Sequence, residues 1–225
     1  MAGDKIAILG GTGAMGGALA LRWAKAGLAV VIGSRAPRRA EEAARAILEK
    51  VPHAAIAGGG LDAAARAAAV VVLAVPYPAH RATLEAVHAA VQGKILVDVT
   101  VPLELPRVAR VALPPEGSAA VAAQGILGPD VRVVAAFETV PARLLALPDA
   151  AIDSDVLVCG DDKDARETVI ALARAAGLSA LHGGALANAA AAEALACVQI
   201  FFNGRYRAPA SGLRFTGLAR DDGSA

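Results

Sequence analysis

The stretch Leu9-Gly10-Gly11-Thr12-Gly13-Ala14-Met15-Gly16-Gly17 decides the fold of this chain. Gly11, Gly13 and Gly16 have the spacing GxGxxG, between an apolar run typical of a buried strand and the start of a helical pattern. There the first glycine permits a sharp turn, the second lets the backbone approach a pyrophosphate, and the third lets helix and strand pack closely. The phosphates would lie at the positive end of the helix dipole. The sequence therefore predicts a dinucleotide site; the alternative is a glycine-rich turn without a ligand.

Short β-rich runs alternate with alanine-rich helical stretches along most of the chain, which is typical of βαβ units around a parallel sheet. Strands are expected at residues 5–9, 29–33, 54–57, 70–74, 94–99 and 131–136, and helices at 14–26, 37–50, 78–91 and near 118. Six such strands predict an α/β fold with a Rossmann-type doubly wound sheet. Further strands are expected at 156–159 and 178–181, with helices at 164–176 and 186–202.

The change of pattern after residue 137 divides the chain into two expected domains. Residues 1–137 would form the dinucleotide-binding Rossmann domain. Residues 138–225 would form a smaller C-terminal α/β domain that completes the pocket of a second substrate and offers a face for dimerisation.

Composition excludes several classes of protein. Lys and Arg number 22 against 21 Asp and Glu, so the net charge of +1 gives no general attraction to nucleic acid or an anionic membrane. Cys159 and Cys197 have no metal or redox spacing, which fits a reducing compartment. Charges interrupt the apolar N-terminal run, so it resembles neither a signal peptide nor a membrane span. We expect a cytoplasmic protein without nucleic-acid or membrane partners.

Gly33-Ser34-Arg35 follows the second expected strand, where NAD enzymes usually place an acidic residue that holds both ribose hydroxyls. An acidic residue would repel a 2′-phosphate, whereas Ser34 can donate a hydrogen bond to it. Arg35, with Arg38 or Arg39 one helical turn further, can pair with the same phosphate. Because cations are misplaced at a helix N-terminus, the cluster favours NADP over NAD. The alternative is a solvated basic helix start.

The chain has few residues for acid–base or nucleophilic chemistry. The Tyr–Lys pair of short-chain dehydrogenases is absent, since Arg81 follows Tyr77 and Ala210 follows Tyr206 at that spacing. The histidines have no metal spacing, and no serine lies in a nucleophile elbow. We therefore expect no catalytic side chain and no metal ligand. Hydride exchange between two stacked cofactor rings is a reaction that fits this composition.

The chain resembles the F420-dependent NADP oxidoreductases, which pass hydride between the 5-deazaflavin F420 and NADP. The likeness covers nearly the whole sequence. Its most distinctive strings are Val158-Cys159-Gly160-Asp161-Asp162 and Gly212-Leu213-Arg214. It also includes Val75-Pro76-Tyr77, Thr139-Val140-Pro141-Ala142 and Gly184-Ala185-Leu186-Ala187-Asn188.

This resemblance implies roles for particular residues. Thr12, Ala14 and Met15 would contact the pyrophosphate, and Ser34, Arg35 and Arg39 would hold the 2′-phosphate. Val75 and Pro76 would border the nicotinamide. The segment from Glu138 through Val140 to Pro141, with the C-terminal helix and tail, would form the deazaflavin pocket. The family is typically dimeric, and residues 186–202 could form the dimer face or be buried within one subunit.

The sequence departs from the family pattern at two places. Glu138 stands where family members often carry His before Thr-x-Pro-Ala, and a second His is replaced near Ser211. A carboxylate beside an anionic deazaflavin is repulsive unless it is neutralised. Two alternatives therefore stay open: an NADPH-dependent reductase of another flat acceptor, such as a flavin or a pterin one-carbon carrier, and a non-catalytic NADP-binding protein.

Overall fold

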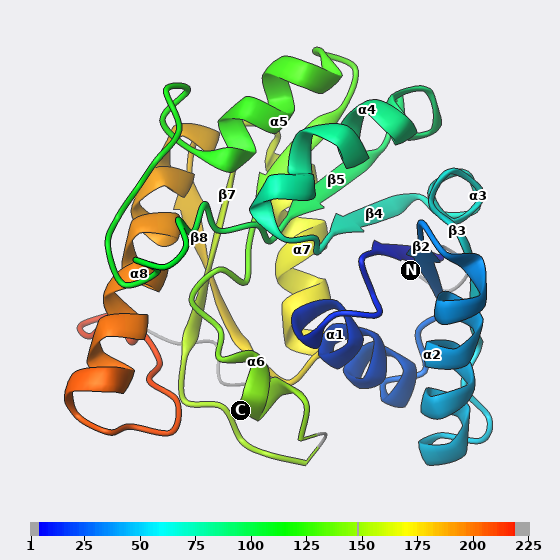
Figure 1. Cartoon of the computed structure of the whole chain (residues 1–225), viewed down its shortest axis with the longest axis horizontal. Coiled ribbons are helices and arrows are strands. Elements are labelled where there is room, and N and C mark those ends of the chain that lie inside the picture. Colours follow the sequence, from blue (N-terminus) through cyan, green and yellow to red (C-terminus); the bar gives the residue numbers. More distant parts are fainter. Residues whose placement is uncertain (1–4, 148, 219–225) are drawn as a thin grey trace.

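A single eight-stranded sheet forms the centre of the computed structural model, which describes residues 5–147 and 149–218 (Figure 1). The strand order is β3-β2-β1-β4-β5-β6-β7-β8, and neighbours are parallel except β6 and β7. The strands are β1 Ile6–Leu9, β2 Val30–Ser34, β3 Ile56–Gly60, β4 Val70–Leu73, β5 Ile95–Asp98, β6 Arg132–Ala135, β7 Asp155–Gly160 and β8 Ser179–Gly184. The order of the first six confirms the predicted Rossmann-type sheet.

Helices cover both faces of this sheet, which is why its strands are apolar on both sides. One apolar core joins the sheet to α1 Ala14–Lys25, α2 Pro37–Lys50, α6 Ala142–Leu145 and α7 Lys163–Ala175. The other joins it to α3 Leu61–Arg66, α4 His80–Val91, α5 Ala119–Leu127 and the start of α8 Ala189–Arg205. The 3₁₀ turns η1 Tyr77–Ala79 and η2 Leu186–Asn188 precede α4 and α8.

Strand β3 begins and ends later than the predicted strand at residues 54–57. The reason is that Gly58, Gly59 and Gly60, which resemble a turn in the sequence, lie inside the strand. A side chain on Gly58 would lie 2.2 Å from the carbonyl carbon of Ala40, so α2 packs directly on the strand backbone. Glycine at this position therefore serves close packing of helix and sheet. The short helices α3 and α6, absent from the sequence prediction, lie beyond the reach of periodicity because neither completes two turns.

The strings Val158-Cys159-Gly160-Asp161-Asp162 and Gly212-Leu213-Arg214 have local structural roles. Asp162 caps α7 by accepting a hydrogen bond from the N–H of Ala165 at 2.7 Å, and Asp161 accepts one from Leu186 at 3.0 Å. A side chain on Gly212 would lie 2.7 Å from the carbonyl oxygen of Asp153. The two strings therefore seat α7, η2 and the tail against β7.

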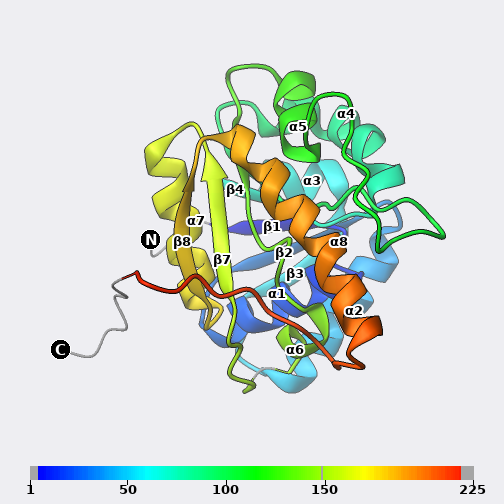
Figure 2. The ribbon, with the colours of Figure 1, turned by 90° about the vertical axis from the view of Figure 1, so that its left-hand side faces the viewer.

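Strands β7 and β8 extend the same sheet, and apolar residues from both sides of residue 137 share the two cores. Figure 2 shows the tail after α8 crossing one end of β7 and β8. The N–H of Asp155 donates to the carbonyl of Leu213 at 2.6 Å, which fixes this crossing. The division of roles between residues 1–137 and 138–225 stays a prediction.

Candidate functional site

The glycine-rich turn joins β1 to α1 at the carboxyl edge of the sheet. Gly10 has φ +88°, and a side chain there would lie 2.4 Å from the carbonyl oxygen of Ala74, so the left-handed residue of the turn is Gly10 rather than Gly11. Gly16 has the packing role expected of the third glycine, because a side chain there would lie 2.8 Å from the oxygen of Gly10. The backbone from Thr12 to Ala14 is exposed at the helix start. The turn therefore leaves the N-terminal N–H groups of α1 open to a ligand.

Basic and hydroxyl side chains lie at the end of β2 and the start of α2. The hydroxyl oxygen of Ser34 accepts a hydrogen bond from the N–H of Ala36 at 3.2 Å, which leaves its own hydrogen free to donate. Arg35 and Arg39 are exposed, and neither forms an ion pair with any residue that the structure describes. The first turn of α2 has no acidic residue to offset them. This cluster is therefore a local excess of positive charge with hydrogen-bond donors unused.

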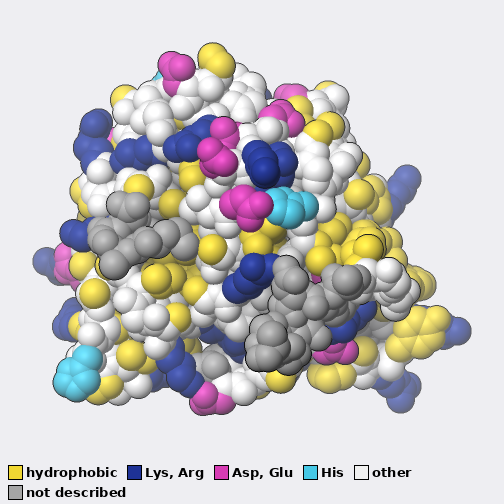
Figure 3. Space-filling view, turned by 180° about the vertical axis from the view of Figure 1, so that it is seen from behind, with side chains coloured by type: hydrophobic (Ala, Val, Ile, Leu, Met, Phe, Trp, Pro, Cys, Tyr) yellow, Lys and Arg dark blue, Asp and Glu magenta, His cyan; other side chains and the backbone are white. Residues whose placement is uncertain are grey.

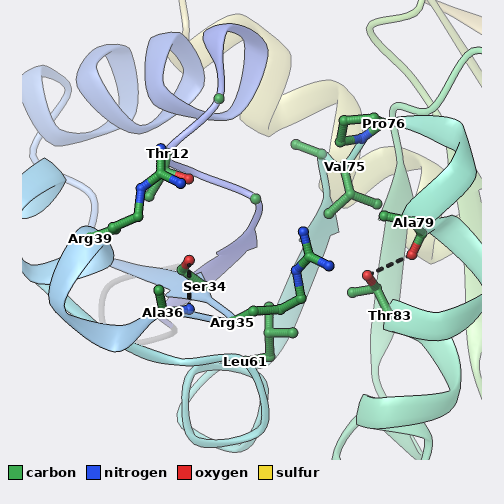
Figure 4. Close-up of a pocket in the computed structure, with 13 residues that line it drawn as sticks. Thr12, Ser34, Arg35, Ala36, Arg39, Leu61, Val75, Pro76, Ala79 and Thr83 are labelled. Carbon is green, nitrogen blue, oxygen red and sulfur yellow. Dashed lines mark hydrogen bonds between the residues drawn. The ribbon is translucent and has the colours of Figure 1, made fainter.

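An open cavity of about 570 Å³ joins the glycine turn to this basic cluster. In Figure 4, Arg35 and Arg39 extend into it from the start of α2. Its lining consists of Gly10, Thr12, Gly13, Ser34, Arg35, Ala36, Arg39, Leu61, Ala74, Val75, Pro76, Ala79 and Thr83. One end of the cavity thus offers hydrogen-bond donors that can bind an anion. The other end offers apolar side chains from the segment that follows β4 and from η1. A dinucleotide needs both environments, with phosphates at one end and a nicotinamide ring at the other.

The cavity brings together seven of the predicted site residues: Thr12, Gly13, Ser34, Arg35, Arg39, Val75 and Pro76. Gly11, Ala14, Met15 and Gly16 belong to the same turn and helix start without lining the cavity. Glu138, Val140 and Pro141 lie elsewhere, in the turn that follows β6. Sequence reasoning missed Leu61, Ala79 and Thr83. Leu61 and Ala79 offer only apolar side chains, and the hydroxyl of Thr83 donates to the carbonyl of Ala79. The sequence therefore gives no signal that these residues line a cavity.

The turn after β6 begins with Phe137 at φ +77°, a left-handed conformation that costs a residue with a side chain about 1–2 kcal/mol. The N–H of Val140 closes the turn by donating to the carbonyl of Phe137 at 3.1 Å. Glu138 lies inside this turn and is only 8% exposed. Gln199 of α8 donates to the carbonyl of the next residue, Thr139, at 3.1 Å. Helix α8 therefore packs over the predicted deazaflavin segment.

A buried acidic environment surrounds Glu138, and sequence reasoning missed it. His80, at the start of α4, pairs with Asp98 of β5 at 2.6 Å between Nε2 and Oδ2. Glu193 of α8 accepts hydrogen bonds from the N–H groups of Ala119 and Ala120 at 2.8 and 3.2 Å. No sequence signal pairs these residues, because each partner lies on a different element.

Burial governs the ionisation of these carboxyl groups. Desolvation raises the pKa of Glu138 well above its ordinary value, and the negative charges of Glu193 and Asp98 raise it further. Desolvation also raises the pKa of Glu193 to about 7, against the lowering effect of its two backbone hydrogen bonds. Burial therefore favours the protonated form of Glu138, and Glu193 is close to half protonated at neutral pH. No three His, Cys, Asp or Glu side chains of the described segments are arranged to hold a metal ion.

Comparison with known proteins places these features in one family. The model of the NADP oxidoreductase coenzyme F420-dependent family matches residues 5–102. The F420-dependent NADP reductase of Methanocaldococcus jannaschii is 38% identical over 222 residues, covering 95% of this chain and 99% of the relative. This chain belongs to the F420-dependent NADP reductase family.

Two further members of this family span the chain in full. The F420-dependent NADP reductase of Methanothermobacter thermautotrophicus is 38% identical and covers 97% of both chains. A crystal structure from Arthrobacter sp. FB24, assigned as an F420-dependent NADP reductase, has a TM-score of 0.80 and 30% identity, covering 97% of this chain and 100% of its own. The predicted family resemblance is confirmed over both the Rossmann part and the C-terminal part.

Proposed function

We propose that this protein is an NADP-dependent oxidoreductase that transfers a hydride directly between NADP(H) and the 5-deazaflavin coenzyme F420. The observation that carries the proposal is a cavity whose glycine turn and basic cluster suit NADP, in a chain that matches F420-dependent NADP reductases over at least 95% of its length. Both cofactors are substrates of this reaction. The names of the relatives do not favour a flavin or pterin acceptor, or a protein without activity.

The residues present fit NADP. The N–H groups of Thr12 and Ala14 would hold the pyrophosphate, with Met15 beside them at the helix start, whereas the N–H of Gly13 donates to the carbonyl of Gly10 at 2.9 Å. The hydroxyl of Ser34 and the guanidinium groups of Arg35 and Arg39 would bind the 2′-phosphate, since nothing else in the described chain pairs with those two arginines. Val75 and Pro76 would lie against the nicotinamide.

Glu138, Val140 and Pro141 would border the deazaflavin. When both substrates are bound, NADPH supplies the hydride and the deazaflavin accepts it at a ring carbon. The protein's part is to hold the two rings about 3–3.5 Å apart and to exclude water. Fixed backbone serves this task, and the turn from Phe137 to Val140 is held by its own hydrogen bond and by Gln199. Because burial raises the pKa of Glu138 and so favours its neutral form, its repulsion of an anionic deazaflavin is reduced.

We further propose a homodimer in the cytoplasm, without a nucleic-acid partner. Helix α8 buries Ala189, Ala192, Glu193, Ala196 and Cys197, yet its last turns expose Phe201 and Phe202. Among the described residues, one helical stretch, Leu186–Arg205, is long and apolar enough to cross a membrane, although it carries the buried Glu193. An exposed aromatic end suits a second subunit.

The surface charge supports the absence of a nucleic-acid partner. On the face in Figure 3, Lys and Arg alternate with Asp, Glu and apolar side chains rather than forming a basic surface.

A spectrophotometric assay tests the activity. The purified protein is mixed with NADPH and, in separate samples, with F420, a flavin and a pterin carrier. We expect the deazaflavin absorbance to bleach at the rate of NADPH oxidation, with no turnover of the other acceptors. Turnover of a flavin or pterin without F420 bleaching would reject the proposal.

A further inference from the structure

The proposed reaction consumes a proton as well as a hydride. Reduction of a deazaflavin by NADPH forms a C–H bond at a ring carbon and an N–H bond at a ring nitrogen. The balanced reaction is NADPH + F420 + H⁺ giving NADP⁺ + reduced F420. A site that excludes water must therefore supply that proton from a side chain, and this inference rests on the proposed function.

The place of Glu138 in the sheet suits such a donor. It follows the last pair of residues that joins β5 to β6, Asp98 with Ala135, and so lies at the carboxyl edge of the sheet where Rossmann proteins bind their substrates. The left-handed Phe137 directs the chain into the turn that holds Glu138, and such strain is often stored at functional sites. Gln199 of α8 also holds this turn, through its hydrogen bond to the carbonyl of Thr139.

The surroundings of Glu138 contain groups that can keep it protonated. From β5 comes Asp98, paired with His80 of α4, and from α8 comes Glu193. From β7 comes the buried thiol of Cys159, whose pKa burial raises to about 11, with Arg166 of α7 acting in the opposite direction on it. Thus no cation among these groups pairs directly with Glu138 in the described structure. The negative charges of Glu193 and Asp98 both oppose ionisation of Glu138, and its raised pKa agrees with that geometry.

We propose that Glu138 is the proton donor of the reaction and that Glu193 restores its proton. As the hydride leaves NADPH with its electron pair and forms the new C–H bond, the O–H bond of Glu138 breaks and its proton joins the ring nitrogen. The resulting carboxylate takes a proton back from Glu193, which exchanges with solvent. In the opposite direction the same carboxylate accepts the proton. The sequence alone predicts no catalytic side chain, whereas the fold points to Glu138 as one.

The variant Glu138→Gln tests the proposal, because glutamine keeps the shape and cannot release a proton. We expect kcat for F420 reduction at pH 7 to fall on the order of 100-fold, with the KM for NADPH within about twofold of wild type. Glu167→Gln, an exposed change on α7, is the matched control and should behave as wild type. A fall in kcat of less than about tenfold would overturn the proposal.

Infrared spectroscopy of the protein without substrates provides a second measurement. At pH 7 we expect a carboxylic-acid C=O band in Glu193→Gln, where Glu193 no longer contributes to it, and its disappearance in the double variant Glu138→Gln/Glu193→Gln. If Glu138→Gln does not fold, the Glu193→Gln protein alone decides, since absence of the band would show that Glu138 is ionised and would overturn the proposal. A wild-type protein that cannot reduce F420 would instead refute the proposed function, whereas an active wild type with an equally active Glu138→Gln refutes only this inference.

Discussion

At the residue scale, Arg35 and Arg39 place positive charge where the dipole of α2 disfavours it, so their contribution to affinity should exceed their contribution to stability. Replacing either with Ala should weaken NADPH binding about 10- to 100-fold, the effect of losing a charge-assisted hydrogen bond to phosphate. NADH binding should change by less than about threefold, because NADH lacks the 2′-phosphate. Fluorescence titration measures both affinities, with the exposed Arg45→Ala of the same helix as control. Equal losses for the two cofactors would contradict the assignment.

Gly10 offers a second test at this scale. The variant Gly10→Ala must accept both a left-handed backbone and a collision with the carbonyl oxygen of Ala74. We expect its free energy of unfolding to fall by roughly 3 kcal/mol in chemical denaturation. Gly27 has φ +79° with nothing within 4 Å of an added side chain, so Gly27→Ala should cost only about 1 kcal/mol. Similar losses in the two variants would mean that the contact with Ala74 relaxes.

At the scale of elements, Arg22 ties α1 to α6 and to the end of α7. Its buried guanidinium donates to the carbonyl oxygens of Leu145 and Ala176, both at 2.9 Å, and burial lowers its pKa. Arg22→Met should lower the free energy of unfolding by roughly 3 kcal/mol or more, because carbonyls from two elements lose their donors. Lys25 lies on the same helix as Arg22, and Lys25→Met removes only its exposed ion pair with Asp149. This variant should cost less than about 1 kcal/mol. A comparable loss in both variants would contradict this role.

Glu193 joins α8 to the N-terminus of α5 and makes their contact depend on pH. Its folded pKa of about 7 lies above the ordinary 4.5, so the folded protein binds this proton more tightly than the unfolded chain. The associated stability is fully present below pH 4.5 and is lost as pH rises through about 7, a change of about 3 kcal/mol. Glu138 acts in the same direction.

Urea denaturation between pH 4.5 and 8 measures this effect through the difference in free energy of unfolding between the wild type and Glu193→Gln. Subtraction removes the contribution of carboxyl groups that the substitution does not affect, whereas Glu138, whose pKa the charge of Glu193 raises, adds to the difference in the same direction. We expect the variant to gain on the wild type as pH rises. A difference that stays constant across this range would exclude a raised pKa at Glu193.

At the scale of the whole molecule, the sequence predicts what local patterns determine. Apolar runs and helix punctuation predict β1 to β6 and the NADP end of the cavity, since Ser34 and Arg35 follow a strand directly. The buried acids could not be predicted, because Glu138 and Glu193 meet only when α8 folds back over the turn after β6. Likewise, Arg22 resembles a solvated helix residue until α6 covers it.

The proposed assembly of two subunits is the property that depends most on the whole molecule. Phe201 and Phe202 are 51% and 42% exposed near the end of α8, and Tyr206 packs edge-to-face on Phe202 with ring centroids 5.8 Å apart. In both ribbon views the segment after β5 runs beside α8, and its Leu105 is 85% exposed (Figures 1 and 2). Phe201, Phe202 and Tyr206 thus form an exposed aromatic group at the end of α8, which a second subunit would cover.

Phe202→Glu should therefore convert a dimer into a monomer, because a buried unpaired carboxylate at the interface costs several kcal/mol. Sedimentation velocity measures the mass, and Glu167→Gln serves as a control that leaves this surface intact. The fold of the monomer should persist, since Phe202 makes no contribution to either apolar core. The NADPH affinity of that monomer should equal that of wild type, because the cavity proposed to bind NADP is lined by residues between positions 10 and 83. A variant that stays dimeric would place the subunit contact on another surface.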